Sequence, residues 1–66
     1  MISTWWFEIT EGDNEGEEFF VEIEGTLDKA KKNAIERAKE IFPTEKLHCL
    51  GRVSATEAEI MGLDTY

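Results

Sequence analysis

Residue types that commonly stabilise or activate a small protein are scarce in this 66-residue sequence, which has one cysteine, Cys49, and one histidine, His48. A single cysteine excludes an intramolecular disulfide, whereas small secreted domains usually depend on several. No apolar run approaches the roughly 18 residues that a membrane span needs. The first residues carry no basic group ahead of an apolar stretch, as a signal peptide would. We therefore expect one cytoplasmic domain, residues 1–66, that does not associate with membranes.

The usual constellations of catalytic and metal-binding residues are also missing. His48 and Cys49 are neighbours in a segment that reads as a strand, so their side chains point to opposite faces and cannot form a nucleophile–base pair. The sequence has no glycine-rich phosphate loop and no zinc-ligand spacing. We expect no enzyme, no cofactor and no metal, although His48 with Glu8, Glu22 and Glu24 on one sheet face is a conceivable divalent-ion site.

Positive charge is absent from the first 25 residues. They contain eight carboxylates and no Lys or Arg, whereas residues 26–66 contain seven acids and seven bases, so the net charge of −8 belongs to the first 25. Five bases lie in residues 27–42, interspersed with acids, and Lys32 and Glu36 have the spacing of a helical ion pair. Because binding to a polyanion depends on neutralising phosphates, we expect no direct nucleic-acid binding.

Two segments near the start alternate apolar and polar residues with the period of a β-strand. In residues 2–10 the inward row is Trp5, Phe7 and Ile9. In residues 17–24 it is Phe19, Val21 and Ile23. The intervening residues 11–16 have turn chemistry, so a hairpin is expected, and opposed residue numbers must have an even sum if both rows are to share a face. Several even registers satisfy this condition.

Residues 27–42 have the apolar spacing of a helix that begins at Thr26 and ends before Pro43. Its apolar stripe contains three alanines, which predicts close packing on the sheet. Residues 46–53 read as a third strand, with Leu47, Cys49 and Val53 inward and His48, Leu50 and Arg52 outward. A short second helix follows Ser54, which begins a Ser-x-x-Glu capping box, and stops at Gly62. The last residues read as irregular.

These elements predict an α+β domain: a three-stranded sheet packed on one long helix, with a short helix at the C-terminal end. The third strand can lie beside the second or, by crossing over, beside the first, and we favour the first. Cys49 is expected to be a small core residue.

The outward face of the sheet is the candidate interaction surface. Its residues are aromatic or apolar groups among carboxylates: Trp6, Glu8, Phe20, Glu22, Glu24 and Leu50. Exposed apolar groups ringed by charge are typical of binding surfaces. The alternative is that the short helix folds back over these rings.

The ending from Gly51 to Tyr66, GRVSATEAEIMGLDTY, resembles the C-termini of small uncharacterised proteins from phages and mobile elements of Gram-positive gut bacteria. The resemblance covers about a quarter of the chain and implies an accessory protein of β-β-α-β-helix order. It implies no activity and no functional residue.

Three functions follow as hypotheses. The first is a non-catalytic interaction module whose acidic hairpin binds a basic protein, because uncompensated carboxylates raise a local negative potential. The second is a more specific version of the first: a nucleic-acid mimic that inhibits a host DNA-binding protein. The third is a structural homo-oligomer associated through Trp6, Phe20 and Leu50.

Overall fold

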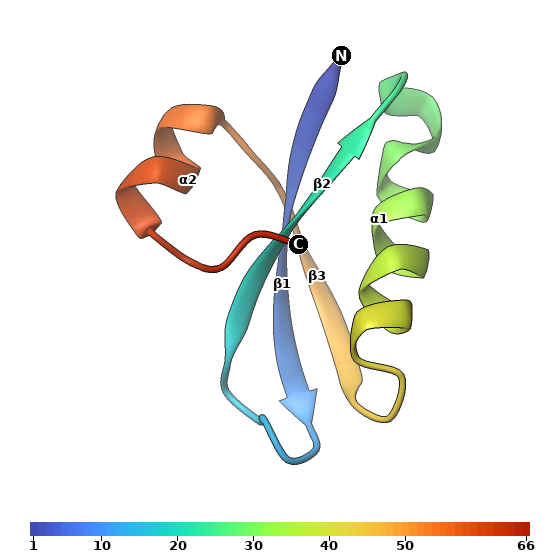
Figure 1. The fold of residues 1–66 in the computed structure, drawn as a ribbon, viewed down its shortest axis with the longest axis vertical. Coiled ribbons are helices and arrows are strands. Elements are labelled where there is room, and N and C mark those ends of the chain that lie inside the picture. Colours follow the sequence, from blue (N-terminus) through green and yellow to red (C-terminus); the bar gives the residue numbers. More distant parts are fainter.

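The computed structural model describes all 66 residues and contains a three-stranded antiparallel sheet with a helix on either side (Figure 1). The elements in chain order are β1 (Ile2–Glu11), β2 (Glu18–Glu24), α1 (Leu27–Ile41), β3 (Lys46–Val53) and α2 (Ala55–Met61). The expected α+β class and order of elements are confirmed. None of the helices is long and apolar enough to cross a membrane.

The strand order is β2-β1-β3, so that the third strand lies beside the first, as favoured from the sequence. In the β1–β2 hairpin Trp6 is opposite Phe20 and Phe7 is opposite Phe19. The opposed numbers have an even sum, because only such a register keeps both apolar rows on one face. Because β1 lies between β2 and β3, the connection from β2 through α1 to β3 crosses over the central strand.

The main core lies between α1 and the inner face of the sheet, the face that carries Phe7. Its buried members are Trp5, Phe7, Ile9, Phe19, Val21, Ala30, Ala34 and Ala38. The three alanines recur every four residues and form one stripe of α1. The Trp5 indole N–H donates to Ser3 Oγ at 2.9 Å, which satisfies its one polar group inside the core.

A bulge in β3 reverses the faces of its last residues. Cys49 pairs with Phe7 but Gly51 pairs with Trp6, so Leu50 is an extra residue in the ladder. Gly51 has a φ of +125°, a conformation that L-residues rarely adopt. After the bulge Arg52 is opposite Trp5 on the inner face and Val53 is opposite Thr4 on the outer face. The expected faces of Arg52 and Val53 are therefore wrong, because strict alternation assumed an uninterrupted strand.

A second, smaller apolar layer covers part of the outer face. Phe20 and Val53 belong to this face and are 1% and 8% exposed. The helix α2 lies on this side of the sheet (Figure 1), with Ala58 and Met61 half-buried. Ser54 Oγ accepts a hydrogen bond from the Glu57 amide at 3.1 Å, so Ser54 is the N-cap of this helix as expected. The Glu57 carboxylate accepts from Ser54 Oγ at 3.2 Å rather than from the Ser54 amide, so the second bond of a capping box is not formed.

The chain after α2 pairs with the free edge of β2, where the sequence predicted irregular structure. The Phe20 amide donates to Asp64 O and the Tyr66 amide donates to Phe20 O, both at 2.8 Å, which makes a parallel bridge between Phe20 and Thr65. The Tyr66 ring packs edge-on against Phe19 and Phe42. Backbone pairing with an exposed edge needs no apolar periodicity, so no residue pattern predicted it.

Candidate functional site

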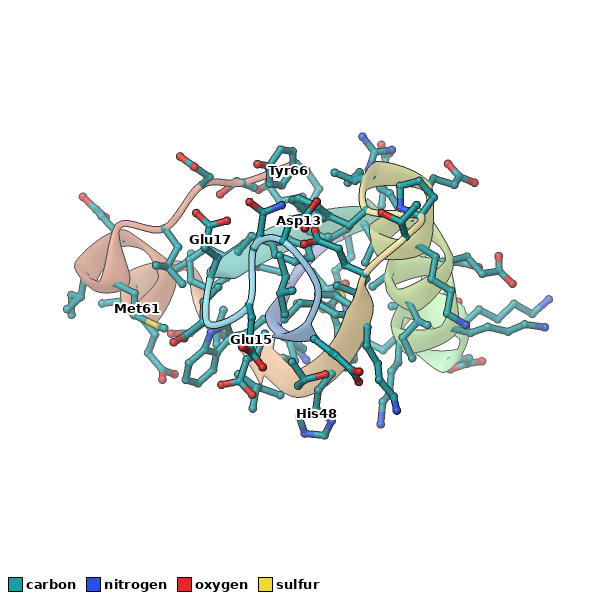
Figure 2. All side chains as sticks on the ribbon, turned by 90° about the horizontal axis from the view of Figure 1, so that it is seen from below. Asp13, Glu15, Glu17, His48, Met61 and Tyr66 are labelled. Atoms are coloured by element: carbon teal, nitrogen blue, oxygen red, sulfur yellow. The ribbon has the colours of Figure 1, made fainter.

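The acidic hairpin is built by a short loop between β1 and β2. Gly16 N donates to Ile9 O at 2.8 Å and closes the loop, with Asp13, Glu15 and Glu17 around it (Figure 2). The Glu45 carboxylate, from the α1–β3 connection, accepts from the Asn14 amide at 2.6 Å and from Asn14 Nδ2 at 3.0 Å. The loop is therefore tied to the neighbouring α1–β3 connection at the same end of the sheet (Figure 1) and presents its carboxylates in a defined place.

A polar row crosses the outer face next to this loop. Glu8, on the central strand, is directly opposite Glu18 on one side and His48 on the other. The indole N–H of Trp6 donates to Glu18 Oε1 at 2.8 Å. Glu8, Glu18 and Trp6 are half-buried, whereas His48 is exposed. Two carboxylates that face each other across a strand pair repel, and one neutral indole donor offsets this repulsion only in part.

The structure separates the six predicted surface residues into different environments. Trp6 and Glu8 are neighbours in the polar row, and Leu50, at the bulge, is 40% exposed. Phe20 is buried beneath the covering of the outer face, so a partner cannot reach it unless that covering opens. Glu22 and Glu24 are exposed near the opposite end of β2, with Glu24 six residues, or about 20 Å, from Glu18.

The carboxylates of the hairpin are almost without counter-ions. The one ion pair in the structure joins Lys46 to Glu11 at 4.0 Å, and both side chains are about three-quarters exposed. Such a pair contributes little. Lys32 and Glu36 have the expected spacing but form no ion pair within 4.0 Å. No group of three His, Cys, Asp or Glu residues is placed to hold a metal ion.

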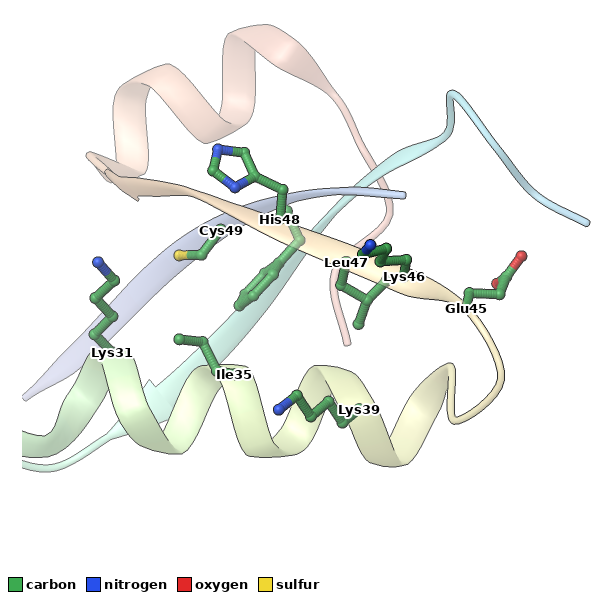
Figure 3. Close-up of a pocket in the computed structure, with 9 residues that line it drawn as sticks. Lys31, Ile35, Lys39, Glu45, Lys46, Leu47, His48 and Cys49 are labelled. Atoms are coloured by element: carbon green, nitrogen blue, oxygen red, sulfur yellow. The ribbon is translucent and has the colours of Figure 1, made fainter. Parts of the chain in front are cut away.

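A groove between α1 and β3 was not predicted from the sequence. It has a volume of about 450 Å³, and its apolar lining residues are Phe7, Ile35, Leu47 and Cys49 (Figure 3). Lys31 and Lys39 reach it from α1, and Lys46 lines it from β3. Cys49 is half-buried at this groove rather than enclosed in the core, which corrects the expectation for this thiol. The His48 ring points away from the groove (Figure 3).

One side of this groove could be predicted in part from the sequence. Lys31, Ile35 and Lys39 recur every four residues and so share one side of a helix. Nothing in the sequence shows that the same side faces a partly uncovered strand. Comparison with protein-family models finds no match, and neither curated proteins nor solved structures include a significant relative.

Proposed function

We propose that this protein is a non-catalytic, cytoplasmic interaction module whose acidic hairpin binds a basic partner protein. The observation that carries the proposal is the separation of charge: β1, β2 and their loop contain eight carboxylates and no base, while all seven bases lie on α1 and β3. A potential of one sign over a rigid element accelerates encounter with a partner of opposite sign.

The polar row supplies a second feature of a binding surface. Trp6 is half-buried beside Glu8 and Glu18, so an amphipathic ring lies among carboxylates at the edge of the acidic loop. A partner that presents Lys or Arg can pair with these carboxylates and place the aliphatic part of its side chain against the indole. A phage or mobile-element protein that occupies the DNA site of a host protein is one concrete form of this function.

A pair of charge-matched variants tests the proposal. In the hairpin variant Glu8, Glu17 and Glu18 become Gln; in the control, the exposed helical residues Glu36, Glu40 and Glu59 become Gln. Both lose three negative charges. The probe is a lysine-rich peptide of fixed length, titrated calorimetrically at low and moderate salt.

We expect the hairpin variant to lose about tenfold or more in affinity, which corresponds to about 1.4 kcal/mol. The control should change much less, and the wild-type affinity should fall as salt rises. Equal losses in the two variants would show that only net charge matters, and the hairpin would then not be the site. Pull-down from a bacterial lysate at low salt can follow to identify the partner.

A further inference from the structure

The outer edge of β3 is unpaired. In the order β2-β1-β3 this strand pairs with β1 alone, whereas the free edge of β2 is partly occupied by Asp64–Tyr66. An open edge presents a row of amide and carbonyl groups to any extended chain. The bulge at Leu50 twists the far end of β3, and the register with β1 shifts again between Leu47 and Lys46, so the flat part of the edge runs from Leu47 to Cys49.

The groove lies next to this flat edge, on the inner side of the sheet. Leu47 and Cys49 are only half-buried there, whereas Phe19 and Val21, on the strand at the other edge of the sheet, are buried. A side chain entering the groove from the edge would meet the apolar surface of Ile35, Leu47 and Cys49. The volume of about 450 Å³ lies within the range of ligand pockets.

Positive charges lie at regular spacing above this apolar surface. Lys31 and Lys39 are eight residues apart on α1, about 12 Å along the helix axis. An extended chain advances about 13 Å in four residues. Because α1 runs alongside β3 (Figure 3), two acidic side chains four residues apart on an added strand match the two ammonium groups. The residue midway between them points the same way, toward Ile35.

We propose that the groove between α1 and β3 binds an extended acidic segment of a partner protein, which adds to the edge of β3 as a further strand. The segment has the pattern acidic–x–apolar–x–acidic. Its backbone pairs with β3 from Leu47 to Cys49, its apolar residue enters the groove, and its carboxylates pair with Lys31 and Lys39. This is strand addition with side-chain pockets for specificity, a recurring mode of peptide recognition.

The net charge of −8 does not oppose this binding strongly. At physiological salt the Debye length is about 8 Å, so exposed charges on the hairpin are screened from most of the groove. The one carboxylate that lines the groove, Glu45, is held by two hydrogen bonds to Asn14 at the loop end. Arg52, which the bulge turns to the inner face, adds a further positive charge on β3 outside the groove lining.

The test uses two synthetic peptides of equal length, one centred on Glu-Thr-Leu-Thr-Glu and the other on Gln-Thr-Leu-Thr-Gln. Binding is measured by the rate at which a thiol reagent modifies Cys49, the only cysteine, and by hydrogen exchange of the β3 amides that do not pair with β1. We expect the acidic peptide to slow both, and the glutamine peptide to bind at least tenfold more weakly.

Two double variants with the same charge change locate the site. Lys31→Gln with Lys39→Gln should lower the affinity for the acidic peptide about tenfold or more. Lys29→Gln with Arg37→Gln, on the same helix but away from the groove lining and the hollow beside it, should change its affinity less than twofold. All of these residues are exposed, and thermal melting verifies that each variant folds.

Three results would overturn the proposal. The first is equal affinity for the two peptides, and the second is equal loss in the two double variants. The third is that decanoate, an apolar chain with one carboxylate, protects Cys49 from the thiol reagent while the acidic peptide has no effect. That result would make the groove a site for a small amphipathic anion. Loss of hairpin binding in the earlier experiment leaves this proposal unaffected, because the two surfaces have opposite charge and share none of the substituted residues.

Discussion

Replacing Phe20 by Ala tests whether the outer layer contributes to folding. The ring is 1% exposed and lies on the face opposite α1, so its burial depends on α2 and on the segment that pairs with β2. Truncation of a buried Phe to Ala removes its transfer free energy and leaves a cavity, at a typical cost of about 3–5 kcal/mol. A covering of one seven-residue helix and a short segment can partly collapse into the space, so we expect the lower end, about 3 kcal/mol.

That loss is large for a domain of this size. At about 0.05–0.15 kcal/mol per residue, a chain of 66 residues has about 3–10 kcal/mol of stability. Phe20→Ala should therefore shift the urea midpoint far toward zero, and Phe20→Leu should give a smaller shift that can be measured accurately. Unfolding is followed by circular dichroism and tryptophan fluorescence at two protein concentrations.

The matched control is Ile60→Ala on α2. Ile60 is 80% exposed, so its truncation should change the free energy of unfolding by no more than about 0.5 kcal/mol. If the Phe20→Ala protein had a urea midpoint like that of the Ile60→Ala variant, the outer layer would not contribute to folding as we propose. A midpoint that rises with protein concentration would instead show that a second copy covers Phe20, because only association depends on concentration.

Three further variants test local features. Gly51→Ala should cost about 1–3 kcal/mol from backbone strain alone, because φ is +125° and an added Cβ meets no atom within 4 Å; a neutral effect in urea unfolding would contradict the bulge. Ser54→Ala should lower the free energy of unfolding by about 0.5–2 kcal/mol, because it removes the N-cap hydrogen bond of α2. Thr26→Ala should lower it less, because the Thr26 side chain makes no cap bond to α1. Calorimetry compares the two variants, and equal losses of stability would contradict this difference. Tyr66→Ala should cost about 1–2 kcal/mol through two ring contacts, and an unchanged melting temperature would show that the ring is not held there.

The order of elements and the even parity of the hairpin register follow from local rules. Trp5, Phe7 and Ile9 occupy alternate positions of β1, as Phe19 and Val21 do in β2, so both rows share a face only if opposed residue numbers have an even sum. Several registers met this condition, and the local pattern did not choose among them. The position of β3 beside β1 was a choice between two topologies that the same sequence pattern allows. The order of elements and the parity were predictable because each depends on neighbours within a few residues along the chain, whereas the strand order depends on contacts between distant residues.

The bulge and the added edge segment depend on contacts between distant residues. A glycine within a strand indicates a possible bulge, but Gly51 alone does not say which neighbour becomes the extra residue or that Arg52 and Val53 exchange faces. The segment Asp64–Tyr66 binds β2 mainly through its backbone, which every sequence possesses. The burial of Phe20 could therefore be stated only as one of two alternatives.

The groove exists because the residues on the two sides of the alanine stripe of α1 differ in polarity. Ala30, Ala34 and Ala38 bring α1 close to the sheet, and the apolar residues Ile41 and Phe42 pack against the same core. On the other flank Ile35 is the one apolar side chain between two lysines, and an ammonium group is too costly to bury without a partner. That flank cannot close over Leu47 and Cys49 as a core would. An acidic side chain removes this cost by pairing with the lysines, so the residues that keep the groove open also specify the charge of its proposed ligand.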